Sequence, residues 1–164
     1  MDSGSSNCPR CLPMITLNLS QGQCVLEHVG AHILHDPGVG LLEPICGLCL
    51  RPSPLCQFFL KKGKGANASL TINQVASKGC LMKLKYNYSV AFESTKSLPC
   101  SNVPIHCPLC PRMDPAIWRY CFKTHFQQKH PNTPFTEYQH IWMLTNFEIV
   151  EMKKNLGRTS KSNG

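Results

Sequence analysis

The 11 cysteines of this 164-residue chain constrain its fold more than any other feature. They include three Cys-x2-Cys pairs, and two of these pairs are followed by closely spaced histidines. An odd number of cysteines fits complete disulfide pairing poorly, whereas Cys-x2-Cys pairs with downstream histidines are typical of metal sites. Thiolate and imidazole are ligands that Zn²⁺ prefers. The pattern therefore predicts small modules that are stabilised by zinc.

The first motif lies in residues 1–35, and a stretch rich in Pro and Gly follows it. Its spacing is Cys-x2-Cys-x16-His-x3-His, in which the two histidines lie one helical turn apart. Two thiols on a tight turn and two imidazoles on a helix can surround one tetrahedral zinc ion. The predicted ligands are Cys8, Cys11, His28 and His32. His35 could replace His32 if the helix ended early.

Residues 107–131 repeat the arrangement with the spacing Cys-x2-Cys-x14-His-x4-His. The predicted ligands are Cys107, Cys110, His125 and His130. Phe122 here and Val25 in the first motif occupy the position that packs the core of a C2H2 finger. Both segments therefore resemble C2H2 zinc fingers, although each loop between the ligand pairs exceeds the usual length of about 12 residues. The resemblance implies a divergent ββα-like fold for each segment.

The finger resemblance also assigns base reading to helix positions −1, 3 and 6. These positions hold Gln21, Cys24 and Glu27 in the first segment and Trp118, Cys121 and Thr124 in the second. Only Gln21 is suited to reading a base edge, and Glu27 would repel phosphate. Sequence-specific recognition in the major groove is therefore not predicted.

Residues 41–106 form a Cys-rich middle segment in which short strands are predicted at 57–60, 69–72 and 82–90. In the last of these, apolar and polar residues alternate, which is typical of a half-buried strand. Such small sheets bury too little surface to be stable alone, so a zinc site of four cysteines is expected. The predicted ligands are Cys46, Cys49, Cys80 and Cys100. Cys56 or His106 could replace one of them, and a zinc ribbon could instead join the pairs at 46/49 and 107/110.

Two stretches, LLEPICGLCLRPSPLCQFFLKKGKG at 41–65 and LPCSNVPIHCPLC at 98–110, together with Lys78-Gly79-Cys80, carry a wider resemblance. They are similar to a family of Cys-rich proteins that basidiomycete fungal genomes encode in many copies. The family offers no function to transfer. The resemblance favours the ligand set that includes Cys100.

The charge is uneven along the chain, whose formal net charge is +8. Residues 51–100 hold eight bases and one acid, which suits contacts with nucleic-acid phosphates. Residues 135–156 are predicted to form an amphipathic helix that could bind a protein partner, and 157–164 a disordered basic tail. No run of 18 apolar residues occurs, so no membrane span is predicted.

The sequence lacks features expected of an enzyme. No His-x-Glu completes a deaminase-like zinc site, and no Gly-Lys-Ser/Thr marks a phosphate loop. The first residues contain no apolar stretch typical of a secretory signal, so a reducing compartment is expected, the nucleus or otherwise the cytoplasm. The predicted fold class is a set of small α+β zinc-stabilised modules. Two ββα-like C2H2 fingers flank a small Cys-clamped antiparallel β segment, and a C-terminal helix follows.

Overall fold

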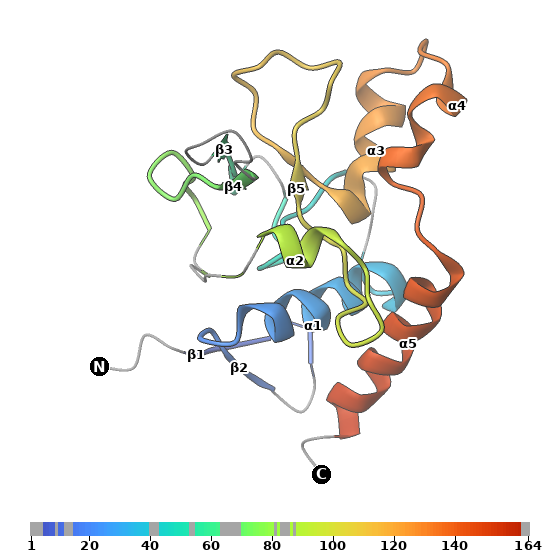
Figure 1. The fold of residues 1–164 in the computed structure, drawn as a ribbon. Coiled ribbons are helices and arrows are strands. Elements are labelled where there is room, and N and C mark those ends of the chain that lie inside the picture. Colours follow the sequence, from blue (N-terminus) through green and yellow to red (C-terminus); the bar gives the residue numbers. More distant parts are fainter. Residues whose placement is uncertain are drawn as a thin grey trace.

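Short antiparallel sheets and several helices make up the computed structural model shown in Figure 1. The described residues are 5–8, 10–11, 15–39, 43–52, 55–62, 70–80, 82, 86 and 88–161. Within them lie three two-stranded sheets, whose strands are only two or three residues long. A large core joins the first two-thirds of the chain to residues 118–121 and to Met152, and a small core forms around Phe122 and Phe126. The predicted small α+β class is confirmed at this level.

The first segment consists of a hairpin followed by a helix. Strand β1 (Ser5–Asn7) pairs antiparallel with β2 (Thr16–Asn18), and α1 (Gly22–His35) follows. Ile15 and Leu17 alternate inward and are buried beneath α1. The helix ends at Asp36, directly before Pro37, as the Pro and Gly in this stretch predicted.

The middle segment contains a second hairpin and a short helix. Strand β3 (Leu60–Lys62) pairs antiparallel with β4 (Leu70–Ile72), close to two of the predicted strands. The predicted strand at 82–90 is wrong at its C-terminal end, because α2 (Tyr88–Phe92) forms there. Tyr88 turns inward and donates its hydroxyl to the Pro104 carbonyl at 2.5 Å, while Val90 is 42% exposed. Residues 83–85 and 87 of that prediction lie outside the described residues.

The third segment repeats the order of the first. Strand β5 (Pro104–Ile105) pairs with β6 (Ile117–Trp118), and α3 (Arg119–Lys129) begins directly after β6. Trp118 is buried and packs edge-on against Phe58 at 5.1 Å between ring centroids. It also covers Gly47, where a Cβ atom would lie 2.4 Å from the indole ring. The middle and third segments are therefore packed into one body.

The predicted single helix over 135–156 is wrong. The chain forms α4 (Phe135–Tyr138), a 3-10 turn (Gln139–Ile141) and, after a break, α5 (Asn146–Lys161). Thr145 accepts a hydrogen bond from the Glu148 backbone N–H at 3.1 Å, which caps the start of α5. The described helix continues to Lys161, so most of the predicted disordered tail at 157–164 is helical.

Glu148 attaches α5 to the rest of the molecule. Its carboxylate is 2% exposed and accepts hydrogen bonds from the Ser101 N–H at 2.9 Å, the Ser101 hydroxyl at 2.7 Å and the Tyr120 hydroxyl. One turn further along α5, Met152 packs against Gly30 of α1. Figure 1 shows the result: α5 lies beside α1, and α2 lies above α1 in this view.

We expect Glu148→Gln to lower the free energy of unfolding by about 1–3 kcal/mol, because an amide leaves buried donors without an acceptor. The matched control is Glu151→Gln on the same helix. Glu151 forms a surface ion pair with Lys154 at 3.1 Å, so its loss should cost less than about 0.5 kcal/mol. Urea unfolding of zinc-loaded protein measures both values, and equal effects would contradict the prediction.

Candidate metal centres

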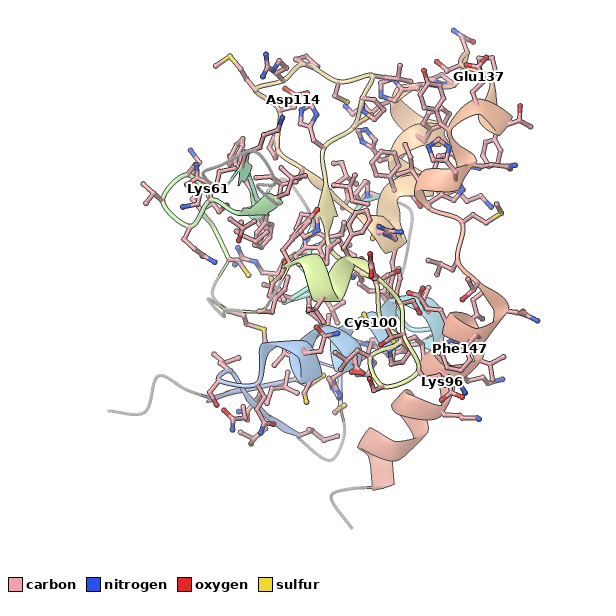
Figure 2. The ribbon with its side chains drawn as sticks, in the orientation of Figure 1. Lys61, Lys96, Cys100, Asp114, Glu137 and Phe147 are labelled. Atoms are coloured by element: carbon pink, nitrogen blue, oxygen red, sulfur yellow. The ribbon has the colours of Figure 1, made fainter. Side chains whose placement is uncertain are left out.

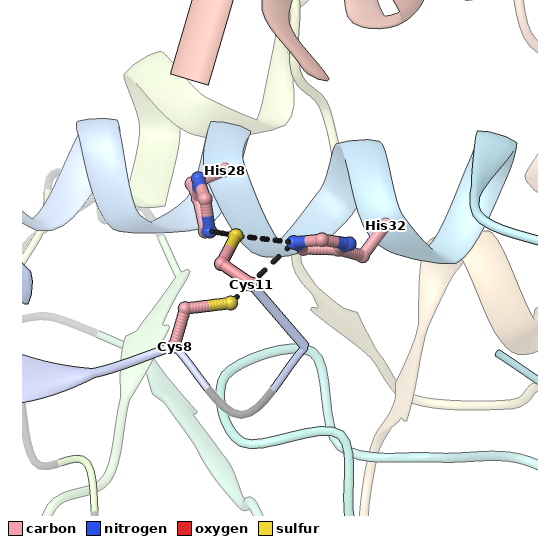
Figure 3. Close-up of side chains that lie close together, drawn as sticks. All are labelled: Cys8, Cys11, His28 and His32. Atoms are coloured by element: carbon pink, nitrogen blue, oxygen red, sulfur yellow. Dashed lines mark hydrogen bonds between the residues drawn. The ribbon is translucent and has the colours of Figure 1, made fainter. Parts of the chain in front are cut away.

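The first cluster joins the turn after β1 to α1. Cys11 Sγ lies 3.5 Å from His28 Nε2 and 3.4 Å from His32 Nε2, and Cys8 Sγ lies 3.4 Å from His32 Nε2. Figure 3 shows the two sulfur atoms facing the two imidazoles across a small common space. All four ligand atoms lie within 4.8 Å of one another, as the sequence motif predicted.

These distances fit a tetrahedral zinc site. Zn–S bonds of about 2.3 Å and Zn–N bonds of about 2.0–2.1 Å place sulfur and nitrogen about 3.6 Å apart on the edges of the tetrahedron. The observed separations of 3.4–3.5 Å are close to this value. The first cluster could therefore hold a metal ion, and its donor set is consistent with zinc.

Asp36 supports this cluster from outside. It contacts His32 Nδ1 at 2.9 Å, and it accepts two hydrogen bonds from Arg10, each 3.1 Å long. Arg10 holds the pKa of Asp36 well below its usual range. A carboxylate bonded to Nδ1 orients the ring and leaves Nε2 free for the metal. Sequence analysis missed Asp36, although an acid one helical turn after a ligand histidine is a usable signal.

The electrostatics of the first cluster favour a cation. Burial opposes ionisation of Cys8, but contacts with His28 and His32 lower its pKa to about 5. Burial and the neighbouring Cys8 raise the pKa of Cys11 to about 12. The second thiol thus resists ionisation beside the first thiolate. The positive charge of a bound divalent cation would offset the repulsion between the two thiolates. Both thiols would then be deprotonated, as thiols that coordinate a metal are.

Four cysteines form the second cluster, and their sulfur atoms also lie within 4.8 Å of one another. The members are Cys46, Cys49, Cys56 and Cys80. Cys46 Sγ lies 3.8 Å from Cys80 Sγ, and Cys49 Sγ lies 3.4 Å from Cys56 Sγ. Two thiolates on one zinc ion are about 3.8 Å apart. The geometry therefore fits an all-thiolate site.

Charge again explains why a cation suits this cluster. Contacts with Cys46 and Cys80 lower the pKa of Cys49 to about 2, while Cys49 and Cys80 raise the pKa of Cys46 above its usual range. Arg51 donates to Cys56 Sγ at 3.8 Å and to the Gly79 carbonyl at 2.9 Å. The guanidinium thus offsets part of the thiolate charge and fixes the loop that carries Cys80.

The predicted ligand Cys100 is not part of this site, so that assignment is wrong. Cys100 is fully buried, and its thiol donates to the Leu26 carbonyl of α1 at 3.5 Å. Cys56, an alternative that the sequence left open, takes its place. The other alternative, His106, donates from Nε2 to the Pro111 carbonyl at 3.0 Å. The zinc ribbon is not formed either, since Cys46 and Cys107 belong to separate clusters.

The third cluster combines Cys107, Cys110, His125 and His130, as predicted. Cys110 Sγ lies 3.3 Å from His125 Nε2 and 3.4 Å from His130 Nε2, and Cys107 Sγ lies 3.5 Å from His130 Nε2. Burial, with help from His130, lowers the pKa of His125 to about 4, so its ring is neutral at neutral pH. Neutral imidazole is the form that binds metal.

The longer His-x4-His spacing of this cluster has a structural explanation. Residues five apart on a continuous helix point in different directions. However, α3 ends at Lys129, and His130 has the non-helical dihedrals φ −131° and ψ 51°. The chain leaves the helix at His130, which brings its ring to within 5.4 Å of the His125 ring, centroid to centroid. The end of the helix therefore compensates for the extra residue.

No protein-family model, no curated protein and no solved structure matches this chain. Within the described ranges, none of the helices is both long and apolar enough to cross a membrane. The three clusters are therefore the features from which a function can be inferred.

Replacing Asp36 tests its role beside the first cluster. We expect Asp36→Asn to weaken zinc binding at this cluster by about 10–100-fold, because His32 loses the carboxylate that orients it. Competition with a chromophoric chelator measures the affinity. Glu43→Gln is the control, since it removes the same charge from an exposed residue outside the cluster. An unchanged affinity in Asp36→Asn would show that the carboxylate has no such role.

Native mass spectrometry tests the composition of the second cluster. The wild-type chain should carry three zinc ions, one for each cluster. Cys56→Ser should lose one of them, because the hydroxyl is a poor zinc ligand. Cys100→Ser should keep all three, because Cys100 faces α1. The reverse pattern would make Cys100 the ligand, as the sequence resemblance implied.

Proposed function

We propose that this chain is a zinc-binding protein whose two C2H2 fingers and four-cysteine site bind nucleic acid through its phosphates, with weak base readout. One observation carries the proposal: three clusters bring four thiol or imidazole donors each within 4.8 Å. Four protein donors are typical of closed structural zinc sites, whereas catalytic sites keep a position open. We therefore propose a structural role for zinc and no enzymatic activity.

The order of elements supports the assignment of the fingers. In both segments a hairpin precedes a helix, the cysteine pair lies between the two strands, and the first ligand histidine lies on the helix. Zinc bound by these donors would join the loop between the two strands to the helix. Phe122 is fully buried behind the third cluster and Val25 lies 1% exposed on α1, in the core positions expected of a finger.

Burial of two base-reading positions in the second finger supports binding with weak readout. Trp118 is 1% exposed and Cys121 is 0% exposed, so neither can reach a base edge. In the first finger, Gln21 and Cys24 are exposed, but of the two only Gln21 is suited to reading a base edge. The net charge of +8 nevertheless attracts a polyanion. These features favour contacts from surface lysines and arginines to phosphates, in keeping with the nuclear location that we expect.

The test is the salt dependence of binding to random-sequence oligonucleotides. If three phosphates are neutralised, duplex affinity should fall about 40-fold between about 50 and 200 mM salt. Gln21→Ala should change neither affinity nor sequence preference, because a single reading residue supplies little discrimination. Chelator-treated protein is the control for the zinc-dependent fold. Strong preference for one sequence, lost in Gln21→Ala, would contradict weak readout.

A second function, protein binding through the C-terminal helix, has its own supporting observation. Phe147 and Val150, one turn apart on α5, are 41% and 48% exposed, and Met143 before the helix is 61% exposed. An apolar stripe of this kind suits a protein partner. This alternative predicts binding that salt barely weakens and a nucleic-acid affinity no greater than that of other basic proteins.

A further inference from the structure

A groove lies between the β3–β4 hairpin, α2 and the loop that carries the third cluster, with a volume of about 670 Å³. We propose that this groove binds a short segment of single-stranded nucleic acid. The inference rests on the proposed function and assigns it a site. The groove lies outside the finger helices, so it does not depend on the base-reading positions.

The apolar wall of the groove offers a surface for stacking. Phe92 is 42% exposed, and the guanidinium of Arg119 lies 4.5 Å from the centre of its ring. Leu70, from β4, adds a side chain that is 40% exposed. Unstacked bases bind to aromatic rings of this kind. Arg119 contacts the ring of Phe92 but is not among the residues that line the groove. Tyr88 fixes the position of α2 through its hydrogen bond to Pro104.

The rim of the groove is cationic. Lys61 and Lys62 are exposed on β3, and Arg112 is exposed on the loop opposite. Asp114, the one acid among the described residues that line the groove, lies on the same loop as Arg112. Figure 2 labels Lys61 and Asp114, which come from the two different elements that border the groove. Lysine and arginine suit phosphates, while a carboxylate can accept a hydrogen bond from a base amino group.

The combination of wall and rim favours a single strand over a duplex. In a duplex the base faces are stacked on one another, so only the backbone could meet the groove. A single strand can place phosphates at Lys61 and Lys62 and a base against Phe92 at the same time. The volume lies within the range of about 300–1,000 Å³ that is typical of ligand sites.

Fluorescence anisotropy with zinc-loaded full-length protein tests this site. The probes are labelled oligo(dT) and oligo(U) of about 12 nucleotides and a random duplex of the same length. Phe92→Leu keeps an apolar side chain but removes the ring. It should weaken single-strand binding about tenfold and leave duplex binding unchanged. The double variant Lys61→Gln with Lys62→Gln should lower the salt slope for single strands by about 1.4.

The matched control is the double variant Lys96→Gln with Lys153→Gln, which removes the same charge from exposed residues outside the groove. It should keep single-strand affinity within about twofold of wild type at 0.15 M salt, because distant exposed charges are screened. Zinc stoichiometry by mass spectrometry checks that every variant is folded and loaded.

The outcomes separate the two proposals. Preferential single-strand binding that both groove variants weaken and the control retains supports the groove. Binding that the groove variants and the control affect equally, or that is as tight for duplex as for single strands, overturns the groove but leaves the proposed function in place. If wild-type protein binds neither probe at about 50 mM salt, the proposed function fails, and the groove proposal fails with it.

Discussion

The rest of the structure depends on the convergence of four donor side chains at each of three points. The sheets of the described residues contribute strands of two or three residues, which cannot be stable without tertiary support. Cys8, Cys46 and Cys107 are at most 3% exposed and belong to the hydrophobic cores. The donor clusters are thus part of the cores themselves, so metal binding at them would be coupled to folding.

Packing between the segments has a second consequence, because it covers surfaces that independent fingers would expose. Trp118 lies over Gly47, and a side chain at Gly30 would meet Tyr120 and Met152. Glu148 then fixes α5 beside α1 through Ser101 and Tyr120. In a tandem finger array each helix is free to enter a groove of DNA. In this chain the helices instead contribute to a common core, and exposed basic side chains lie on the β3–β4 hairpin, on the loops and on the outer faces of α3 and α5.

The sequence predicted the parts of the site that local geometry determines. A tight cysteine turn and two histidines on one helix face fix the first ligand set through chain periodicity alone. The third set has the same cysteine turn, but His130 reaches it only because α3 ends at Lys129. Cys56 and Cys100 are single cysteines, and only the tertiary path of the chain decides which one faces Cys46. The C-terminal end of the strand predicted at 82–90 is wrong, because the anchoring of Tyr88 overrides the alternation of apolar and polar residues. The break before α5 had a signal, Thr145-x-x-Glu148, which the longer apolar stripe obscured.

Zinc loading would act on the position of the basic surface more than on its charge. Each Cys2His2 site loses two thiol protons and gains a divalent cation, so its charge does not change. The four-cysteine site becomes more negative by two charges, which lowers the net charge from +8 to about +6. Arg51, already bonded to Cys56, faces that added charge directly. Lys61 lies on β3, between Cys56 and Cys80 of the second cluster in the sequence, and Arg112 lies on the loop that carries Cys107 and Cys110. Metal ions bound at these clusters would therefore help to set the spacing between the two cations, and that spacing would determine which polyanion the proposed groove could accept.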